Sequence, residues 1–269
     1  MKAKEKISFP SIIDLARYIQ DTPVSPLCGD SSTSSSPSLK WDLKQGFDAA
    51  VDMASKGGAW PKGSEGMMDS HIEMAAIKEG RVDAEDYEVV GHTLDIDAYL
   101  NGQPDCFINE GDEDDARLPV ITIGVQIGRQ SGVDSKSILL RGAAVLSVID
   151  SLESQGHRVE LTAMWSNEND GGIADFRTCI KSAEQPWSPS AVAFALCHPS
   201  FSRRLMFRVA ETFKSLRDFT IGYGRGCNGP SKEFDVWMPW QSLKYRDARQ
   251  ALFDVEGSIK QQLKNKAAA

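Results

Sequence analysis

The stretch Val120-Ile121-Thr122-Ile123-Gly124-Val125-Gln126-Ile127 is a β-branched run of strand length, and it decides the fold. After a Gly-rich loop, Asp134 or Ser135 can cap a helix that ends at Gly156. Residues 158–165 then alternate apolar and polar side chains, as a half-buried strand does. A strand–helix–strand unit this compact predicts a parallel sheet with a right-handed crossover. The apolar face expected on the helix consists of Ile138, Gly142, Val145, Ile149 and Leu152.

Downstream, a turn at Asn167–Gly172 predicts a hairpin with a returning strand up to Lys181, which we expect to form an antiparallel edge. A helix over 190–213, interrupted near His198-Pro199, two strands and a last helix follow. We place those strands at 218–223 and 234–238 and the last helix at 242–264. The fold class predicted is therefore α/β, with a mostly parallel sheet.

Upstream of residue 118 the pattern is mainly helical. Helices are expected at 7–22 (capped by Ser8 or Ser11), 46–56, 66–79 and 96–100, with a turn at Trp60–Gly63 and a strand at 87–90. The run Ser31–Ser36 is interpreted as a flexible linker, and Asp112–Asp115 as a solvated loop. These elements divide the chain into an N-terminal helix with linker (1–45), a helical or mixed accessory region (46–117) and an α/β core (118–269).

Composition excludes several classes of protein. The chain has 269 residues, 41% of them hydrophobic, and no apolar run approaches the ~18 residues of a membrane span. Five cysteines, an odd number and widely spaced, argue against both a disulfide framework and a zinc finger. A net charge of −8 disfavours nucleic acid as a partner, although Arg203, Arg204 and Arg208 could form a local basic patch on one helix. We expect a cytoplasmic protein.

Residues 118–165 resemble the opening of a von Willebrand factor type A domain, and the resemblance extends over 118–240. The segment Ser154–Leu161 is similar to the Gly-then-basic turn that leads to that family's second strand. The resemblance implies a Rossmann-like fold, here with N-terminal helical decoration. The family's metal loop carries Asp-x-Ser-x-Ser after the first strand, whereas this chain reads Gly128-Arg129-Gln130-Ser131-Gly132. No metal site is therefore expected.

A second resemblance covers most of the chain. The chain is similar to an uncharacterised family of proteins from bacteriophages and prophages, and this implies a phage-related origin in the cytoplasm of a host cell without implying a reaction. The matching segments are Gly58–Gly63, Asp97–Pro104, Arg141–Leu146 and Phe194–Pro199.

Motifs of common catalytic sites are missing: the sequence holds no phosphate-binding P-loop, no His-Glu-x-x-His and no Gly-x-Ser-x-Gly. The pair Cys197-His198 invites a thiolate interpretation, but a buried cysteine beside a helix break is favoured. Asp150, Glu160 and Lys181 resemble a metal nuclease arrangement only weakly, because charged residues on a strand's solvent face are ordinary. No catalytic residue and no cofactor is predicted.

Two Gly-rich segments, 128–132 and 222–226, each carry an arginine and follow an expected strand. Loops at the carboxyl ends of parallel strands form a natural crevice, and a helix N-terminus there favours an anion. Arg129, Gln130, Ser131 and Arg225 are therefore the candidate anion-binding residues. The alternative is that the glycines only permit tight turns.

Two functions remain open. The first is a phage-related, non-enzymatic module that binds a host or phage protein, and we favour it because catalytic motifs are missing. The second is an anion- or nucleotide-binding protein, or a nucleic-acid-processing enzyme, that uses the strand-end loops. The oligomeric state is not predicted.

Overall fold

A six-stranded mixed sheet forms the centre of the protein. The structure, a computed structural model, describes residues 3–28, 30–34, 43–79, 87–88, 93–94, 107–108, 119–128, 133–169, 172–216, 225–227, 229, 231–239 and 244–267. The strands follow the order β1-β7-β6-β5-β9, and β8 pairs with β6. Their bounds are Ala3–Phe9 (β1), Val120–Gln126 (β5), Arg158–Asn169 (β6), Gly172–Lys181 (β7), Arg225–Gly226 (β8) and Val236–Met238 (β9).

Strand directions confirm the α/β class and correct one detail. β5 runs parallel to both β6 and β9, and β6 forms the expected antiparallel hairpin with β7. The hairpin is not an edge of the sheet, because β1 pairs in parallel with the far side of β7, from Ala3 opposite Gly172 to Phe9 opposite Thr178. The prediction of an antiparallel edge hairpin was therefore wrong.

The N-terminal segment begins with a strand whose last residues, 7–9, belong to the helix expected at 7–22. Residues 3–9 form β1, and the helix, α1, spans only Ile12–Asp21. In the strand, Ile7 and Phe9 face the same side as Phe176 and Thr178 of β7, whereas Lys4 and Lys6 face the other. Pro10 follows the strand, and Ser11 accepts a hydrogen bond from the Asp14 N–H as the N-cap of α1.

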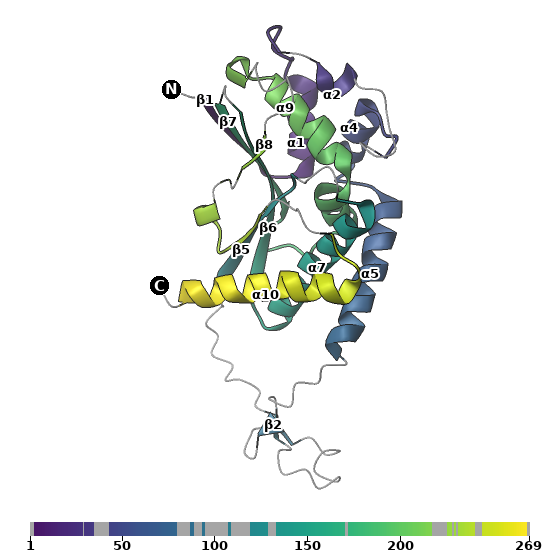
Figure 1. Cartoon of the computed structure of the whole chain (residues 1–269), viewed down its shortest axis with the longest axis vertical. Helices are drawn as coiled ribbons and strands as arrows, with labels where there is room; N and C mark the ends of the chain where they lie inside the picture. Colours follow the sequence, from purple (N-terminus) through teal and green to yellow (C-terminus); the bar gives the residue numbers. More distant parts are fainter. Residues whose placement is uncertain are drawn as a thin grey trace.

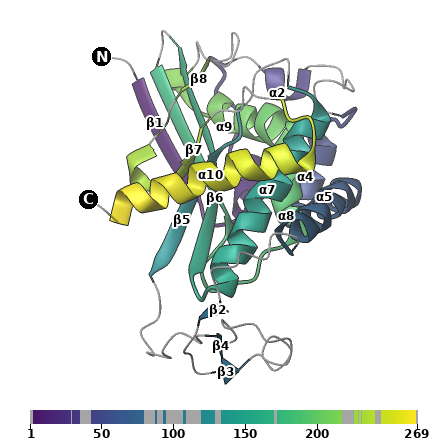
Figure 2. The same ribbon diagram turned by 60° about the horizontal axis from the view of Figure 1, so that its bottom comes forward.

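Helices cover one face of the sheet. They are α1, α4 (Phe47–Ser55), α5 (Pro61–Glu79), α7 (Ser135–Ser154), α8 (Pro189–Val192), α9 (Phe207–Glu211) and α10 (Ala248–Ala267). Figure 1 shows α1, α4, α5, α7 and α9 on the same side of the sheet, and Figure 2 shows α10 crossing in front of it beside α7. Among the described residues, no helix is long and apolar enough to cross a membrane.

Two expected helices appear with their predicted buried faces. Asp134 caps α7, and Ile138, Val145 and Ile149 are buried in the core. The helix expected at 190–213 is interrupted at His198 as predicted, and π-helical turns occupy Ala193–Cys197 (η1) and Phe201–Met206 (η2). Trp60–Gly63 is not a separate turn, because Pro61 is the first residue of α5.

The Ser-rich segment is partly structured where a flexible linker was expected. Ser31–Ser34 forms a helical turn, α2. Ser32 is fully buried, and its Oγ donates to Glu211 Oε2 at 2.5 Å while Arg204 Nη1 donates to the Ser32 carbonyl at 2.7 Å. The predicted basic patch is thereby covered, since Arg204 is itself fully buried and Arg208 pairs with Asp30.

A separate three-stranded sheet joins Tyr87–Glu88 (β2), Phe107–Ile108 (β4) and Thr93–Leu94 (β3). β2 coincides with the start of the strand expected at 87–90. The helix predicted at 96–100, the acidic run at 112–115 and the strand predicted at 218–223 lie outside the described residues.

Candidate functional site at the carboxyl ends of β5 and β9

Arg141 of α7 lies where β5 and β9 end. Its Nη1 donates to the carbonyl of Gln126, the last residue of β5, at 3.3 Å. Its Nη2 donates to the carbonyl of Pro239, directly after β9, at 2.6 Å. The chain leaves β5 through α7 toward β6, whereas β9 lies on the other side of β5. A crevice outside the carboxyl ends of strands, where the strand order changes in this way, is the usual ligand position in open α/β sheets.

The charge of Arg141 is buried without an acidic partner among the described residues. Arg141 is 8% exposed, and among the described residues it donates hydrogen bonds only to the two main-chain carbonyls. Burial lowers its pKa to about 10, partly opposed by the nearby Tyr245 and Cys197, so the guanidinium stays protonated at neutral pH. The adjoining segments 129–132 and 240–243 contain no Asp or Glu in the sequence. A buried cation without a counter-ion is costly, and an anion would offset that cost.

The side chain of Gln126 ties the neighbouring segments together. Its amide nitrogen donates to the Ser166 carbonyl at 2.6 Å and to the Cys227 carbonyl at 3.4 Å. Its amide oxygen accepts the N–H groups of Gly128 at 3.2 Å and Ser166 at 3.3 Å. Gln126 is fully buried, so these bonds join the end of β5 to β6 and to the segment after β8.

Only part of the anion site predicted from the sequence lies within the described residues. Arg129, Gln130 and Ser131 lie outside the described residues. Arg225 belongs to β8 and is opposite Glu168 near the end of β6; its side chain is not described. Gly128, the first residue of the first segment, and Cys227, directly after the second segment, both bond to Gln126. The described residues of the two segments, Gly128 and Arg225–Gly226, therefore lie near the same end of the sheet.

The first turn of α7 is fastened at its N-cap and to the segment before α10. Asp134 Oδ1 accepts the Ser137 N–H at 2.7 Å, and this bond is the main reason why the pKa of Asp134 lies below its ordinary value. Ser137 Oγ accepts the Tyr245 N–H at 2.9 Å, so the segment before α10 is fastened to this turn. Burial raises the pKa of the Tyr245 phenol, which stays protonated.

Sequence reasoning missed Arg141. The residue stands before a run of small and apolar residues, Gly142 to Leu146, which are buried in α7. An arginine inside such a run is an anomaly that could have marked it, because Arg is rarely buried without a partner.

Other candidates resolve into ordinary structural contacts. Asp150 accepts from Trp187 Nε1 at 2.7 Å and lies 2.8 Å from His71 Nε2, whereas Lys181 pairs with Glu153 at 2.6 Å. Both side chains thus have other partners, and neither pairs with Glu160 among the described residues. Cys197 is buried, as favoured from the sequence, 3.6 Å from the Ile138 carbonyl. No group of three metal-ligating side chains occurs among the described residues.

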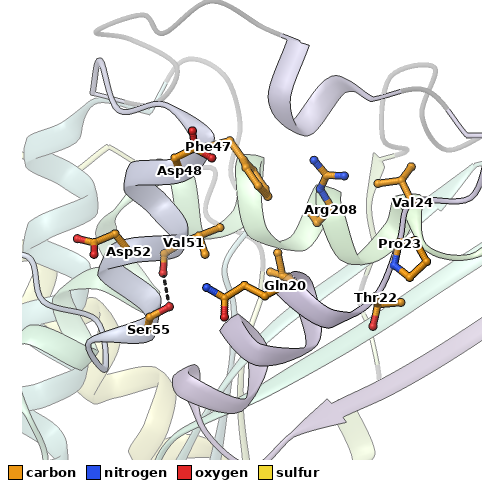
Figure 3. Close-up of a pocket in the computed structure, with 11 residues that line it drawn as sticks. Gln20, Thr22, Pro23, Val24, Phe47, Asp48, Val51, Asp52, Ser55 and Arg208 are labelled. Carbon is orange, nitrogen blue, oxygen red and sulfur yellow. Dashed lines mark hydrogen bonds between the residues drawn. The ribbon is translucent and has the colours of Figure 1, made fainter.

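A wide groove of about 680 Å³ lies between α1, α4 and α9. Figure 3 shows Phe47 and Arg208 on one side of it pointing toward one another, with Gln20 of α1 opposite. The Arg208 guanidinium lies 4.5 Å from the Phe47 ring centre and 3.3 Å from Asp30. Its charge is thus already compensated, in contrast to that of Arg141.

Comparisons with known proteins give one match. No curated protein and no solved structure matches the chain. A family model described as a domain of unknown function, DUF7192, matches residues 2–265. The chain therefore belongs to the DUF7192 family.

Proposed function

We propose that the protein binds a small anion, a phosphate or carboxylate group, in the crevice at the carboxyl ends of β5 and β9. The observation that carries this proposal is the buried guanidinium of Arg141, which donates only to main-chain carbonyls among the described residues. Phosphate and carboxylate suit a planar guanidinium because both can accept two parallel hydrogen bonds. The N-terminus of α7 also favours negative charge, but the Asp134 carboxylate already caps it, so the proposal rests on Arg141.

The loops predicted from the sequence would complete this site. Gly128 and Cys227 both bond to Gln126 at the end of β5; Arg129 directly follows Gly128, and Arg225 stands two residues before Cys227. In the proposal these two arginines supply further contacts to the anion, and Arg141 supplies the buried contact. The order β5, α7, β6 and antiparallel β7 also agrees with what the von Willebrand A resemblance implies. That resemblance and the phage origin stay predictions.

A thermal unfolding series with inorganic phosphate tests the proposal. A ligand at a hundred times its Kd should raise the free energy of unfolding by about 2.7 kcal/mol. Arg141→Met keeps the side-chain volume and removes the charge, so it should abolish the phosphate effect relative to its own phosphate-free baseline. Arg129→Ala and Arg225→Ala should weaken the effect. Arg246→Met is the control, because the Arg246 side chain is 85% exposed.

Chloride at matched ionic strength separates binding from general screening. An equal phosphate shift in the wild type and in Arg141→Met would contradict the proposal, as would no shift in the wild type.

The protein-binding function expected from the sequence stays a second proposal. Ile72 on α5 is 62% exposed and Phe253 on α10 is 49% exposed, and the two helices contact one another. Exposed large apolar side chains of this kind suit a protein partner. Affinity purification from infected cells with the wild type and with Ile72→Ser tests this second proposal. A partner that both proteins retain equally would not use the surface around Ile72.

A further inference from the structure

The face of the sheet opposite the helices carries polar and charged side chains. Glu160 and Thr162 of β6 lie beside Arg177 and Cys179 of β7, and Thr162 is opposite Cys179 in the register. The only described helical element on this side is η4 (Ser231–Glu233), a single turn to the left of the sheet in Figure 1. Glu233 pairs there with Arg177 and, at 3.1 Å, with Lys6.

Phe234 closes one side of a groove on this face. Its ring lies over Gly124 of β5, where an added Cβ would come within 2.6 Å of the ring, and the Arg177 guanidinium lies 5.8 Å from the ring centre. The groove has a volume of about 340 Å³, which is near the lower end of small-molecule sites. The residues that line it are Ser8, Phe9, Pro10, Thr122, Glu160, Thr162, Arg177, Cys179, Glu233 and Phe234.

Thr162 is a buried polar side chain that opens into this groove without a partner. It is 6% exposed, and its hydroxyl makes no hydrogen bond with any residue that the structure describes. The other lining hydroxyl of the central strands, that of Thr122, is already bonded to Asp235 at 2.9 Å. The Thr162 oxygen is not among the fully enclosed polar atoms that lack a partner, so it is open to the groove and offers an acceptor and a donor to a bound molecule.

The carboxylates of the groove differ in their partners. Arg177 and Lys6 share the carboxylate of Glu233, whereas Glu160 forms no ion pair with a described residue. Burial, and next the charge of Glu160, raise the pKa of the Cys179 thiol, so it stays neutral and does not compete as an anion. The unmet charge in the groove is therefore the half-buried carboxylate of Glu160.

We propose that this groove binds the ammonium group of a small organic amine. The Glu160 carboxylate is the counter-ion, and the Thr162 hydroxyl accepts a second N–H of the same group. An ammonium has three donors in a compact arrangement, which two adjacent acceptors on one strand can share. Residues 160 and 162 point to the same side of β6, roughly 7 Å apart along the strand, close enough for one ligand to contact both. The proposal is independent of the anion site, which lies at the carboxyl ends of β5 and β9.

Isothermal titration of the full chain with butylammonium chloride and with 1,4-diaminobutane tests this proposal. We expect saturable binding of both by the wild type. Glu160→Gln preserves the shape and removes the charge, and it should weaken binding by about tenfold to a hundredfold, the equivalent of one charged hydrogen bond. Thr162→Val, which keeps the side-chain shape, should weaken it by about three- to tenfold.

The controls locate the site. Glu168→Gln removes a carboxylate further along the same strand and should leave the affinity unchanged. Tetramethylammonium has no N–H donor and should not bind. Circular dichroism verifies that each variant is folded. If Glu160→Gln does not fold, Thr162→Val provides the test.

The proposal is overturned if the wild type binds neither amine. It is also overturned if Glu160→Gln and Thr162→Val both bind the amines as tightly as the wild type does, or if Mg²⁺ binds and displaces the amines.

Discussion

The side chain of Gln262 in α10 bonds to both main-chain groups of Trp237 in the edge strand β9. Gln262 Oε1 accepts the Trp237 N–H at 2.8 Å, and Gln262 Nε2 donates to the Trp237 carbonyl at 3.1 Å. Among the described strands β9 pairs with β5 alone, so its outer edge would otherwise present unpaired groups to that side. A side-chain amide here replaces one residue of a neighbouring strand and fastens α10 to the sheet.

Replacement of Gln262 by Ala should therefore cost about 1–3 kcal/mol in the free energy of unfolding, since two main-chain groups lose their partners. Urea titration measures this cost. Gln261→Ala is the matched control, because Gln261 is exposed on the same helix and bonds only to Asn265 among the described residues. A similar loss in both variants would show that helix propensity, rather than the contact with β9, is responsible.

Ile149→Ala should destabilise the protein by about 2–5 kcal/mol, because the side chain is fully buried and its removal leaves a cavity. Chemical denaturation gives the value. Ile72→Ala, at a position 62% exposed, should change stability by no more than about 0.5 kcal/mol. If Ile149→Ala lowered the free energy of unfolding as little as Ile72→Ala does, the description of α7 as packed on the sheet would be wrong.

Gly142→Ala should destabilise the protein although alanine favours helix. The new Cβ would lie 2.5 Å from the Cys197 sulfur, and overpacking of this kind costs about 1–3 kcal/mol. Gly257→Ala on α10 is the control, because no atom lies within 4 Å of its Cβ position. That variant should gain about 0.5–1 kcal/mol. In a double-mutant cycle Cys197→Ala should relieve the cost of Gly142→Ala, and strict additivity would contradict the clash.

Asp134 should contribute stability at neutral pH that is lost in acid. Its pKa is depressed in the folded state, chiefly by the Ser137 N–H, so the contribution is complete above the unfolded pKa and disappears as pH falls through the folded one. Asp134→Ala should cost about 0.5–2 kcal/mol near pH 7. Unfolding curves between neutral pH and pH values below 3.8 should show this difference shrinking. A constant difference would mean that the charge of Asp134 plays no part.

The sequence by itself determined the elements whose signals are local. The cap at Asp134, the buried face of α7 and the break at His198 follow from the spacing of residues within one element, and the structure confirms them. The strand before α7 and the hairpin of β6 with β7 were accessible for the same reason. The candidate arginines at 129 and 225 came from such local patterns as well.

Tertiary structure decided what depends on residues far apart in the chain. β1 pairs with β7 although more than 160 residues separate the two strands in the sequence, and no periodicity in residues 3–9 predicts which strand is the partner. A strand that pairs only through its backbone carries no side-chain signature of its neighbour, which is why the hairpin was wrongly placed at the edge. The buried charge of Arg141 likewise exists only because the ends of β5 and β9 meet around it. Burial and the absence of a counter-ion are properties of the packed chain, so local spacing could not predict them.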